Sequence, residues 1–383
     1  AAATLLQSQT AAVSSLVTNQ QMAEMPMNGR TFTMLLRLGP GAYTGSSGNL
    51  ANSPYAMRGD VNISVNGSSA QNNSYLIDGM VNRNLWLSTL ILVPTIDSIQ
   101  EVRLLTSNYS AEYGSAAGAV TVVQTKSGTN DFHGGLYEFL RNDKLAANSF
   151  FNNRLGARKP DFRRNEFGGT FGGPIRRDRT FFFLDYQGIR IRQPRSITST
   201  IPTLAQRAMV TTGDFSGLGA AVFDPANVVG GQRAAFRDNR IPASRLDPAA
   251  VRMFALLPAP TSPAATRNFV FNPVVAQRTD QFDVRVDENV GSADRVFFKY
   301  SYDTTDLTTP GSLPSPANAG IPIGGYLSAD GNDTATIVPL KNWSATLNFT
   351  KVAGPHIVNE TRVGAVRWNQ FILPLGNAFN TAD

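Results

Sequence analysis

The stretch from Thr279 to Asp303 alternates apolar and polar side chains through two successive segments, and this pattern limits the fold more than any other feature of the chain. Alternation with a period of two places neighbouring side chains on opposite faces of a β-strand, so the stretch predicts a hairpin. Gly291 lies between the segments, where it can supply the positive φ of a tight turn. The predicted register opposes Phe282 and Tyr300, Val284 and Phe298, Val286 and Val296, Asp287 and Arg295, and Asp283 and Lys299.

In this register one face of the hairpin is apolar and the other carries pairs of opposite charge, with Phe297 as the exception. A soluble sandwich and a membrane-spanning sheet both fit the hairpin taken alone. Charged residues make up only 16% of the chain, against about 25% in ordinary soluble domains. The longest apolar run, 85–93, is shorter than the about 20 residues of a membrane helix, so a bilayer could be crossed only by a barrel.

Strands are predicted throughout the second part of the chain, and the connections between them alternate between long and short. Transmembrane barrels show this asymmetry, with short turns at the periplasmic rim and long loops at the external rim, whereas a sandwich has no reason to gather its long loops at one end. The predicted strands are 131–142, 164–173, 180–193, 279–289, 293–303, 341–352 and 356–369.

Two further patterns are typical of membrane strands. Tyr300, Tyr302 and Trp343 are predicted to lie at one rim as an interfacial girdle. Along 341–350, apolar side chains alternate with Asn, Ser and Thr, and this polar face suits a watery lumen. Seven strands cannot close a barrel with a wide lumen, so we expect residues 131–383 to form part of a barrel in a longer protein.

The first part of the chain mixes short strands and short helices, which indicates a small α+β domain over 19–130, whereas residues 1–18 specify little. Asp78-Gly79 predicts a turn. The predicted helices are 20–24 and 31–38, and the predicted strands are 62–65, 74–77, 99–105 and 119–125.

An ordered series of motifs resembles the TonB-dependent outer-membrane receptors, and more narrowly their Oar-like branch. The resemblance implies that 1–18 is a leading segment from a preceding β domain. It also implies an α+β plug domain followed by antiparallel transmembrane β-barrel strands, of which about seven out of about 22 would lie in this chain. No TonB box is recognisable before residue 20. The motifs are MPMNGR at 25–30, NSYLIDG at 73–79, NYSAEYG at 108–114, TKSGTN at 125–130, RRNEFGG at 163–169 and QFDVRVD at 281–287.

What the resemblance implies about function is uptake of an external solute through a plugged barrel in the bacterial outer membrane. The implied partners are TonB in the periplasm, outer-membrane lipid, and a solute such as a siderophore, an oligosaccharide or a peptide. An Oar-like surface adhesin or protein-export factor is the alternative, and a soluble β-rich secreted protein is a third possibility. Nucleic acid is not an expected partner, because the basic residues are not interleaved with stacking aromatics.

Ligand contacts in such receptors come from loops at the plug apex and from the external rim. Trp86 beside Arg83 could stack on and hydrogen-bond a sugar or peptide, although packing of 85–93 between plug and barrel explains the same residues. The predicted ligand-binding residues are Tyr55, Arg58, Asn82, Arg83, Asn84 and Trp86.

Catalytic chemistry finds no support in the residue pattern. The chain has no cysteine, and its two histidines, His133 and His356, have no recognisable third ligand, so we expect no metal site and no cofactor. The glycines at 168–173 lack the Lys-Ser/Thr and helix of a phosphate loop, and no carboxylates pair at catalytic spacing, so no enzymatic activity is predicted. A basic cluster in the first external loop fits either a solvated loop or contact with lipopolysaccharide phosphates; its members are Arg154, Arg158, Lys159, Arg163 and Arg164.

Overall fold

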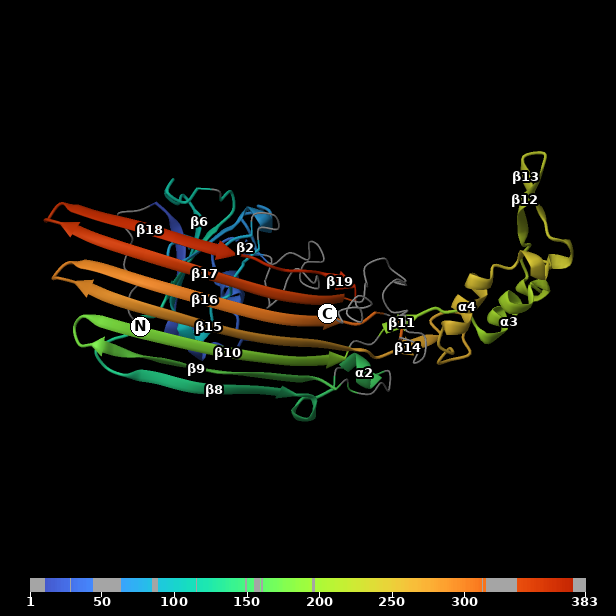
Figure 1. Cartoon of the computed structure of the whole chain (residues 1–383), viewed down its shortest axis with the longest axis horizontal. Coiled ribbons are helices and arrows are strands. Elements are labelled where there is room, and N and C mark those ends of the chain that lie inside the picture. The colour runs from blue at the N-terminus through green and yellow to red at the C-terminus, as the bar shows by residue number, and fades with distance from the viewer. Residues whose placement is uncertain are drawn as a thin grey trace, which may run out of the picture.

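The computed structural model contains two sheets of very different size (Figure 1). A five-stranded sheet has the order β1-β6-β7-β4-β5, and an eight-stranded sheet has the order β18-β17-β16-β15-β10-β9-β8, with β19 paired to β17. We call the first sheet and the helices around it, within 11–125, the plug, and the second sheet the wall. The structure describes residues 11–27, 29–43, 63–84, 89–114, 116–148, 150–154, 159, 161–194, 197–311, 313–314 and 336–374.

The plug has an apolar core of its own, in which Phe32, Met22 and Ile99 are among the most deeply buried side chains. A capping box of Thr18 and Gln21 begins α1 and confirms the helix predicted at 20–24. The plug elements are β1 Val13–Thr18, α1 Asn19–Glu24, η1 Phe32–Leu38, β2 Ala42–Tyr43, β3 Ser64–Val65, η3 Ala70–Asn72, β4 Ser74–Ile77, β5 Met80–Val81, η4 Ile96–Ser98, β6 Ile99–Ser107 and β7 Val120–Thr125.

Three plug strands, β1, β2 and β5, were not predicted, and β1 is the longest of them. β1 pairs antiparallel with β6, yet its sequence gives no alternation, because Val17 is its only buried residue. Pairing with a distant strand, rather than a pattern of its own, makes Val13–Thr18 extended. The predicted boundaries of the leading segment, the plug and the barrel stay predictions.

All seven strands predicted after residue 131 are present in the wall, and each pairs antiparallel with its neighbours. Figure 1 shows them side by side, with the short turns 177–179, 291–293 and 354–356 at one end and the elements of residues 197–271 beyond the other end. The described residues leave the wall open, with β8 and β18 as its edges. The wall elements are β8 His133–Asn142, β9 Arg163–Arg176, β10 Thr180–Pro194, β15 Val274–Val290, β16 Asp294–Thr309, β17 Thr336–Ala353, β18 Ile357–Arg367 and β19 Leu373–Pro374.

The predicted register of the β15–β16 hairpin is wrong by two residues. Phe282 lies opposite Tyr302, and Asp283 lies opposite Ser301. Gly291 does take a positive φ, 69°, but it is the first residue of the turn rather than its centre, since Val290 pairs with Asp294. A shift of two residues keeps every side chain on its predicted face, so the two faces survive although the pairs change.

The wall exposes its apolar face and buries its polar face. Phe282 is 39% exposed and its neighbour Gln281 only 1%; on β17, Leu347 is 48% exposed and Asn348 only 3%. A soluble sandwich would show the opposite arrangement, because its apolar side chains would meet a second sheet. The structure therefore excludes that alternative and favours an apolar surface facing hydrocarbon, with the polar face turned to the plug.

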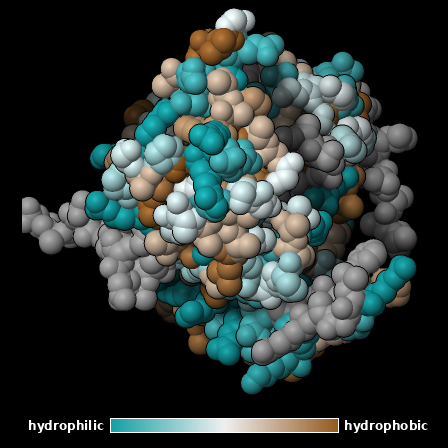
Figure 2. Space-filling view, turned by 90° about the vertical axis from the view of Figure 1, so that its right-hand side faces the viewer, coloured by the Kyte–Doolittle hydropathy of each residue, from teal (hydrophilic) through white to brown (hydrophobic). Residues whose placement is uncertain are grey.

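The long connection between β10 and β15 carries a folded unit, which we call the distal module, within residues 197–271. Its base is the pairing of β11 Ile197–Ser199 with β14 Phe269–Phe271. Figure 1 shows it projecting beyond the wall, and Figure 2, seen from that end, shows hydrophobic residues interspersed among hydrophilic ones. The module also contains α3 Leu204–Thr212, η6 Ser216–Leu218, β12 Phe223–Val229, β13 Gln232–Ala235, η7 Arg237–Asn239, η8 Ala243–Arg245 and α4 Pro248–Leu256; the first long connection carries η5 Asp143–Leu145 and α2 Phe150–Arg154.

Candidate functional site

The turn between β4 and β5 holds a carboxylate of the plug against the wall. Asp78 and Gly79 have φ values of 48° and 78°, the conformation of a two-residue hairpin turn that favours Asp-Gly. This confirms the predicted turn. The Asp78 carboxylate accepts two hydrogen bonds from Thr125, at 2.9 Å from the backbone N and at 2.7 Å from Oγ1. These bonds fix its position at the edge of the plug.

Two cations of the wall converge on this carboxylate. Lys299 Nζ lies 3.2 Å from Asp78 Oδ2, and Arg285 Nη1 lies 3.5 Å from Asp78 Oδ1. The Lys299 and Asp78 side chains are only 7% and 5% exposed. Removal of one member of a buried pair leaves the other charge uncompensated, at a cost of about 3–5 kcal/mol.

Burial and charge act on Asp78 in opposite directions. Removal from water raises the pKa of its carboxyl group, whereas Lys299, Arg285 and the hydrogen bonds from Thr125 lower the pKa. The lowering contributions together outweigh burial, so the pKa of Asp78 lies below its ordinary value. The carboxylate is therefore ionised at neutral pH.

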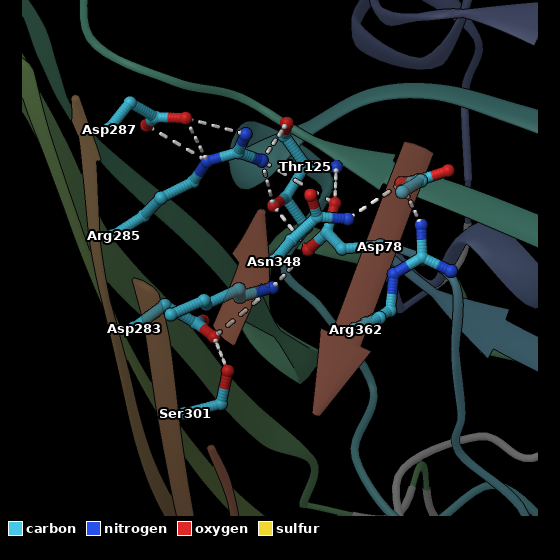
Figure 3. Close-up of polar contacts among 10 residues, drawn as sticks. Asp78, Thr125, Asp283, Arg285, Asp287, Ser301, Asn348 and Arg362 are labelled. Carbon is cyan, nitrogen blue, oxygen red and sulfur yellow. Dashed lines mark hydrogen bonds and ion pairs between the residues drawn. The ribbon is translucent and has the colours of Figure 1, made fainter. Parts of the chain in front are cut away.

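Further contacts of Arg285 and Lys299 hold the two cations in position (Figure 3). Arg285 Nη2 donates to Asp287 Oδ1 at 2.8 Å, and its Nη1 donates to the carbonyl oxygen of Thr125 at 3.1 Å. The guanidinium also lies over the ring of Phe297, 4.3 Å from the ring centre, which explains why this aromatic residue lies on the polar face of the β15–β16 hairpin. Lys299 Nζ lies 3.9 Å from Asp283 Oδ1 as well.

A third wall cation reaches the same turn from β18. Arg362 Nη1 donates to the carbonyl oxygen of Gly79 at 3.2 Å. Glu360 accepts from Arg362 Nη2 and also from Asn348 Nδ2, the latter at 2.6 Å. We call Asp78, Gly79, Lys299, Arg285 and Arg362 the latch.

A cavity of about 1000 Å³ adjoins the latch at the end of the wall where the turns are short. Its lining mixes acids and bases from both units, including Glu112 and Lys126 of the plug side and Arg295 and Glu360 of the wall. The cavity is polar and close to balanced in charge, which suits water or a hydrophilic solute.

Other polar contacts join the plug and the wall away from the latch. Arg164 Nη2 donates to the carbonyl oxygen of Gly29 at 3.1 Å and pairs with Glu166, and Thr95 Oγ1 donates to Asp185 Oδ2 at 2.8 Å. On β17, Asn342 Nδ2 donates to the carbonyl oxygen of Ile91 at 2.7 Å. The polar face of the wall, predicted to meet a watery lumen, thus meets the plug.

Three of the six predicted ligand residues, Tyr55, Arg58 and Trp86, lie outside the described residues. The other three lie side by side at the base of the segment around residue 86. Asn82 is buried and exchanges two hydrogen bonds with the backbone of Leu92, while Arg83 Nη1 donates to the carbonyl oxygen of Asn73. The backbone N of Asn84 donates to the carbonyl oxygen of Thr89 at 2.8 Å. The ligand-binding role of all six stays a prediction.

Of the basic cluster predicted in the first long loop, Arg158 lies outside the described residues, and two other members bind backbone carbonyl oxygens. Arg164 points to the plug, as described above, and Lys159 Nζ donates to the carbonyl oxygens of Asp143 and Ala146. Within the described residues, no group of three or more His, Cys, Asp or Glu side chains could hold a metal ion. The part of the chain that the structure describes also has no helix long and apolar enough to cross a bilayer.

Sequence patterns did not predict the latch. They assigned Asp78 to a turn, and Arg285 and Lys299 to the polar face of a hairpin, but they did not single out Arg362. The available signal was the presence of two cations, Arg285 and Lys299, on the face predicted to turn inward.

The chain was compared with known proteins. Residues 6–121 match the family described as TonB-dependent Receptor Plug Domain, and residues 124–383, more than half of the chain, match the family described as Outer membrane beta barrel domain. A curated relative, the TonB-dependent transporter Oar of Myxococcus xanthus, is 29% identical over 162 residues, which cover 39% of this chain and 14% of that protein.

Solved structures share the fold at low sequence identity. The outer membrane transporter YddB of Escherichia coli superposes with a TM-score of 0.54 at 13% identity, over 92% of this chain and 38% of that one. A variant of the ferric enterobactin receptor PfeA of Pseudomonas aeruginosa superposes with a TM-score of 0.50 at 14% identity, over 94% of this chain and 41% of that one. The chain thus spans less than half the length of these relatives.

Proposed function

This chain belongs to the TonB-dependent receptor family, with a plug and a β-barrel domain of the bacterial outer membrane, and on that premise we propose that it takes up an external solute through the barrel. The curated relative named above is a transporter, which supports uptake as the activity. At the level of the family the function is transport rather than catalysis.

The observation that carries the proposal is the polar character of the plug–wall contact. The latch and the contacts of Arg164, Thr95 and Asn342 are hydrogen bonds and ion pairs. Water can replace such partners when the surfaces separate, whereas an apolar core would have to expose hydrocarbon. The plug keeps its own apolar core, so it can change its contacts with the wall without unfolding as a whole.

In the proposed cycle, an external solute binds at the plug apex, for which the predicted residues are Tyr55, Arg58, Asn82, Arg83, Asn84 and Trp86. TonB then acts on the periplasmic side of the plug. Solute binding favours the state for which the solute has the higher affinity, and TonB supplies the work of moving the plug. A siderophore, an oligosaccharide and a peptide are the proposed solute classes.

Uptake in a strain lacking the gene tests this function. Three probes serve, namely an iron-loaded catecholate siderophore, a fluorescent oligosaccharide and a fluorescent peptide. We expect accumulation of one probe to require both this protein and TonB. Equal accumulation of all three probes with and without the protein would contradict transport of these classes.

The distal module favours a second candidate, surface adhesion or protein export. It carries exposed apolar side chains at its far hairpin, among them Phe223, Val228 and Val229. Single exposed apolar residues are common, but a folded unit at the end of the wall is available for contact with other molecules. Loss of surface adhesion on deletion of 197–271, with probe uptake unchanged, would support this candidate over transport.

A further inference from the structure

We propose that the solute crosses between the plug and strands β16–β18, and that the β4–β5 turn, residues 78–80, is the inner gate of this path. The inference rests on the proposed transport function and adds where the path runs and which residues close it.

The path begins on the periplasmic side with the cavity of about 1000 Å³. Plug residues of β4 and β7 line one side of it, and wall residues of β15–β18, such as Phe297, Asn348 and Arg362, line the other. The cavity ends at Asp78 and Gly79, so it reaches the latch but does not pass it.

A second, much smaller pocket continues on the other side of the turn. It has about 20 Å³, enough for roughly one water, and its lining includes Met80, Asn82 and Thr346. Asp78 lines both pockets. One turn of the plug, with the wall side chains that hold it, therefore separates the large cavity from space leading towards the predicted ligand residue Asn82.

Two glycines let this turn close tightly against β18. A side chain at Gly79 would place its Cβ 2.0 Å from Arg362 Nη1, and a Cβ at Gly364 would lie 2.6 Å from the terminal methyl of Met80. Arg362 and Met80 thus occupy the space that larger residues would fill. Two contacts therefore close the turn against β18. Arg362 donates to the backbone carbonyl oxygen of Gly79, and the thioether of Met80 packs against the backbone of Gly364.

Movement of the turn breaks its own bonds to β7, from Thr125 to the Asp78 carboxylate and from the Asp78 backbone N to the carbonyl oxygen of Val123, but does not require the plug core to unfold. β5 is the edge strand of the plug sheet and pairs only through Leu76–Val81 and Ile77–Met80. The contacts of Arg164, Thr95 and Asn342 lie on other segments and stay intact if only this turn is displaced. Displacement of the turn releases the latch and joins the two pockets.

Another part of the described wall borders a smaller pocket. It has about 110 Å³, lies between the plug and β9–β10, and is lined by Arg30 and Arg164. Arg30 fills part of this contact, since it pairs with Asp97 at 3.0 Å and lies over the rings of Tyr137 and Phe139. The cavity beside β16–β18 is about nine times larger, so we assign the path to β16–β18.

Ion conductance of the full-length protein in planar bilayers tests the gate without any knowledge of the solute. The variants are Met80→Ala and the double variant Met80→Ala with Arg362→Ala. Arg164→Ala is a matched control, because Arg164 also lies two residues from a glutamate and donates to a plug glycine carbonyl. Heat-modified mobility on gels verifies that each variant has folded.

We expect the double variant to conduct about tenfold or more above wild type, the effect of about 1.4 kcal/mol on a two-state gate. The conductance of the single Met80→Ala variant should lie between that of wild type and that of the double variant. The conductance of Arg164→Ala should stay near that of wild type. Folded gate variants that remain closed would overturn the proposal. If Arg164→Ala conducts as much as the double variant, the proposal is also overturned, because loss of any plug–wall contact would then open the barrel.

A cross-link supplies the second arm, since the chain contains no cysteine. Met80→Cys with Gly364→Cys, bridged by a short cleavable bifunctional thiol reagent, should take up far less of whichever probe the wild type accumulates than the same variant before bridging, and cleavage of the bridge should restore that uptake. Continued uptake by the bridged protein would overturn the gate. If the wild type accumulates no probe, transport has failed instead, and the conductance results still decide whether the gate exists.

Discussion

The latch and the distal module both contain ion pairs between aspartate and a basic residue, yet the two sets lie in opposite surroundings. Lys299 and Asp78 of the latch are 7% and 5% exposed, whereas Arg240 and Asp214 of the module are 65% and 37% exposed. Water and salt screen the module pair, so it contributes little to stability. The burial of an ion pair, rather than the number of ion pairs, therefore decides how much it contributes to the stability of this protein.

Asp78→Ala should have the largest effect on that comparison. It leaves Lys299 and Arg285 without their shared anion, at a cost of about 3–5 kcal/mol in the free energy of docking the plug turn. Hydrogen exchange of the β4–β5 amides should accelerate by the corresponding factor. Asp214→Ala is the matched control and should leave exchange in the module nearly unchanged. If both variants accelerate hydrogen exchange equally near the lost ion pair, the buried and the exposed pair contribute equally, which would contradict the comparison.

A charge on the apolar face should have the next largest effect. Phe298→Arg places a cation on the outward face of β16 and should destabilise the barrel by about 2–4 kcal/mol if that side chain lies near the bilayer midplane. Val229→Arg, at an apolar residue of the module that is even more exposed, should cost almost nothing. Urea unfolding in liposomes measures both. If both variants unfold at the wild-type urea concentration, the outward face of β16 does not meet hydrocarbon.

Acid should weaken the latch only at low pH. Because the pKa of Asp78 is lowered in the folded protein, its contribution is fully present above the ordinary carboxyl range, about 4, and is lost as pH falls through the lowered pKa. Protection of the β4–β5 amides should therefore be constant from neutral pH down to about 4 and decline below it. Asp78→Asn should lack this acid step, and an unchanged step in that variant would assign the titration to another group.

Removal of the distal module should have the smallest effect on the barrel. Replacing residues 197–271 by a short Gly-Ser linker removes the β11–β14 pairing but none of the wall pairs. We expect insertion and thermal unfolding of the barrel to match wild type. Failure to insert would mean that the module takes part in assembly of the wall.

Local pattern was enough to predict the wall. All seven predicted strands are present, and period-two alternation was clearest in β15, β16 and β17; the Asp-Gly pair predicted the turn at Asp78. The register of β15–β16 was wrong because alternation fixes the face of a side chain but not its partner, and Gly291 could begin or centre the turn. The folded distal module was also not predicted, since its short elements depend on contacts among themselves.

The latch could not be predicted because its parts are far apart in the chain. Asp78 and Lys299 are separated by 221 residues, and neither local sequence indicates that the two side chains are in contact. Burial of Lys299 beside Asp283 is understandable only when the plug supplies a second anion. The prediction of such a site requires the facing surface as well as the strand pattern.

The central claim is that the exposed apolar face of the wall meets lipid while the polar face meets the plug. Fluorophores attached to Leu347→Cys and Asn348→Cys, one residue apart on β17, test it directly in liposomes that contain nitroxide-labelled lipid. We predict strong quenching at position 347 and almost none at position 348, where the side chain is buried towards the plug. Equal quenching at both positions, or stronger quenching at position 348, would contradict the account.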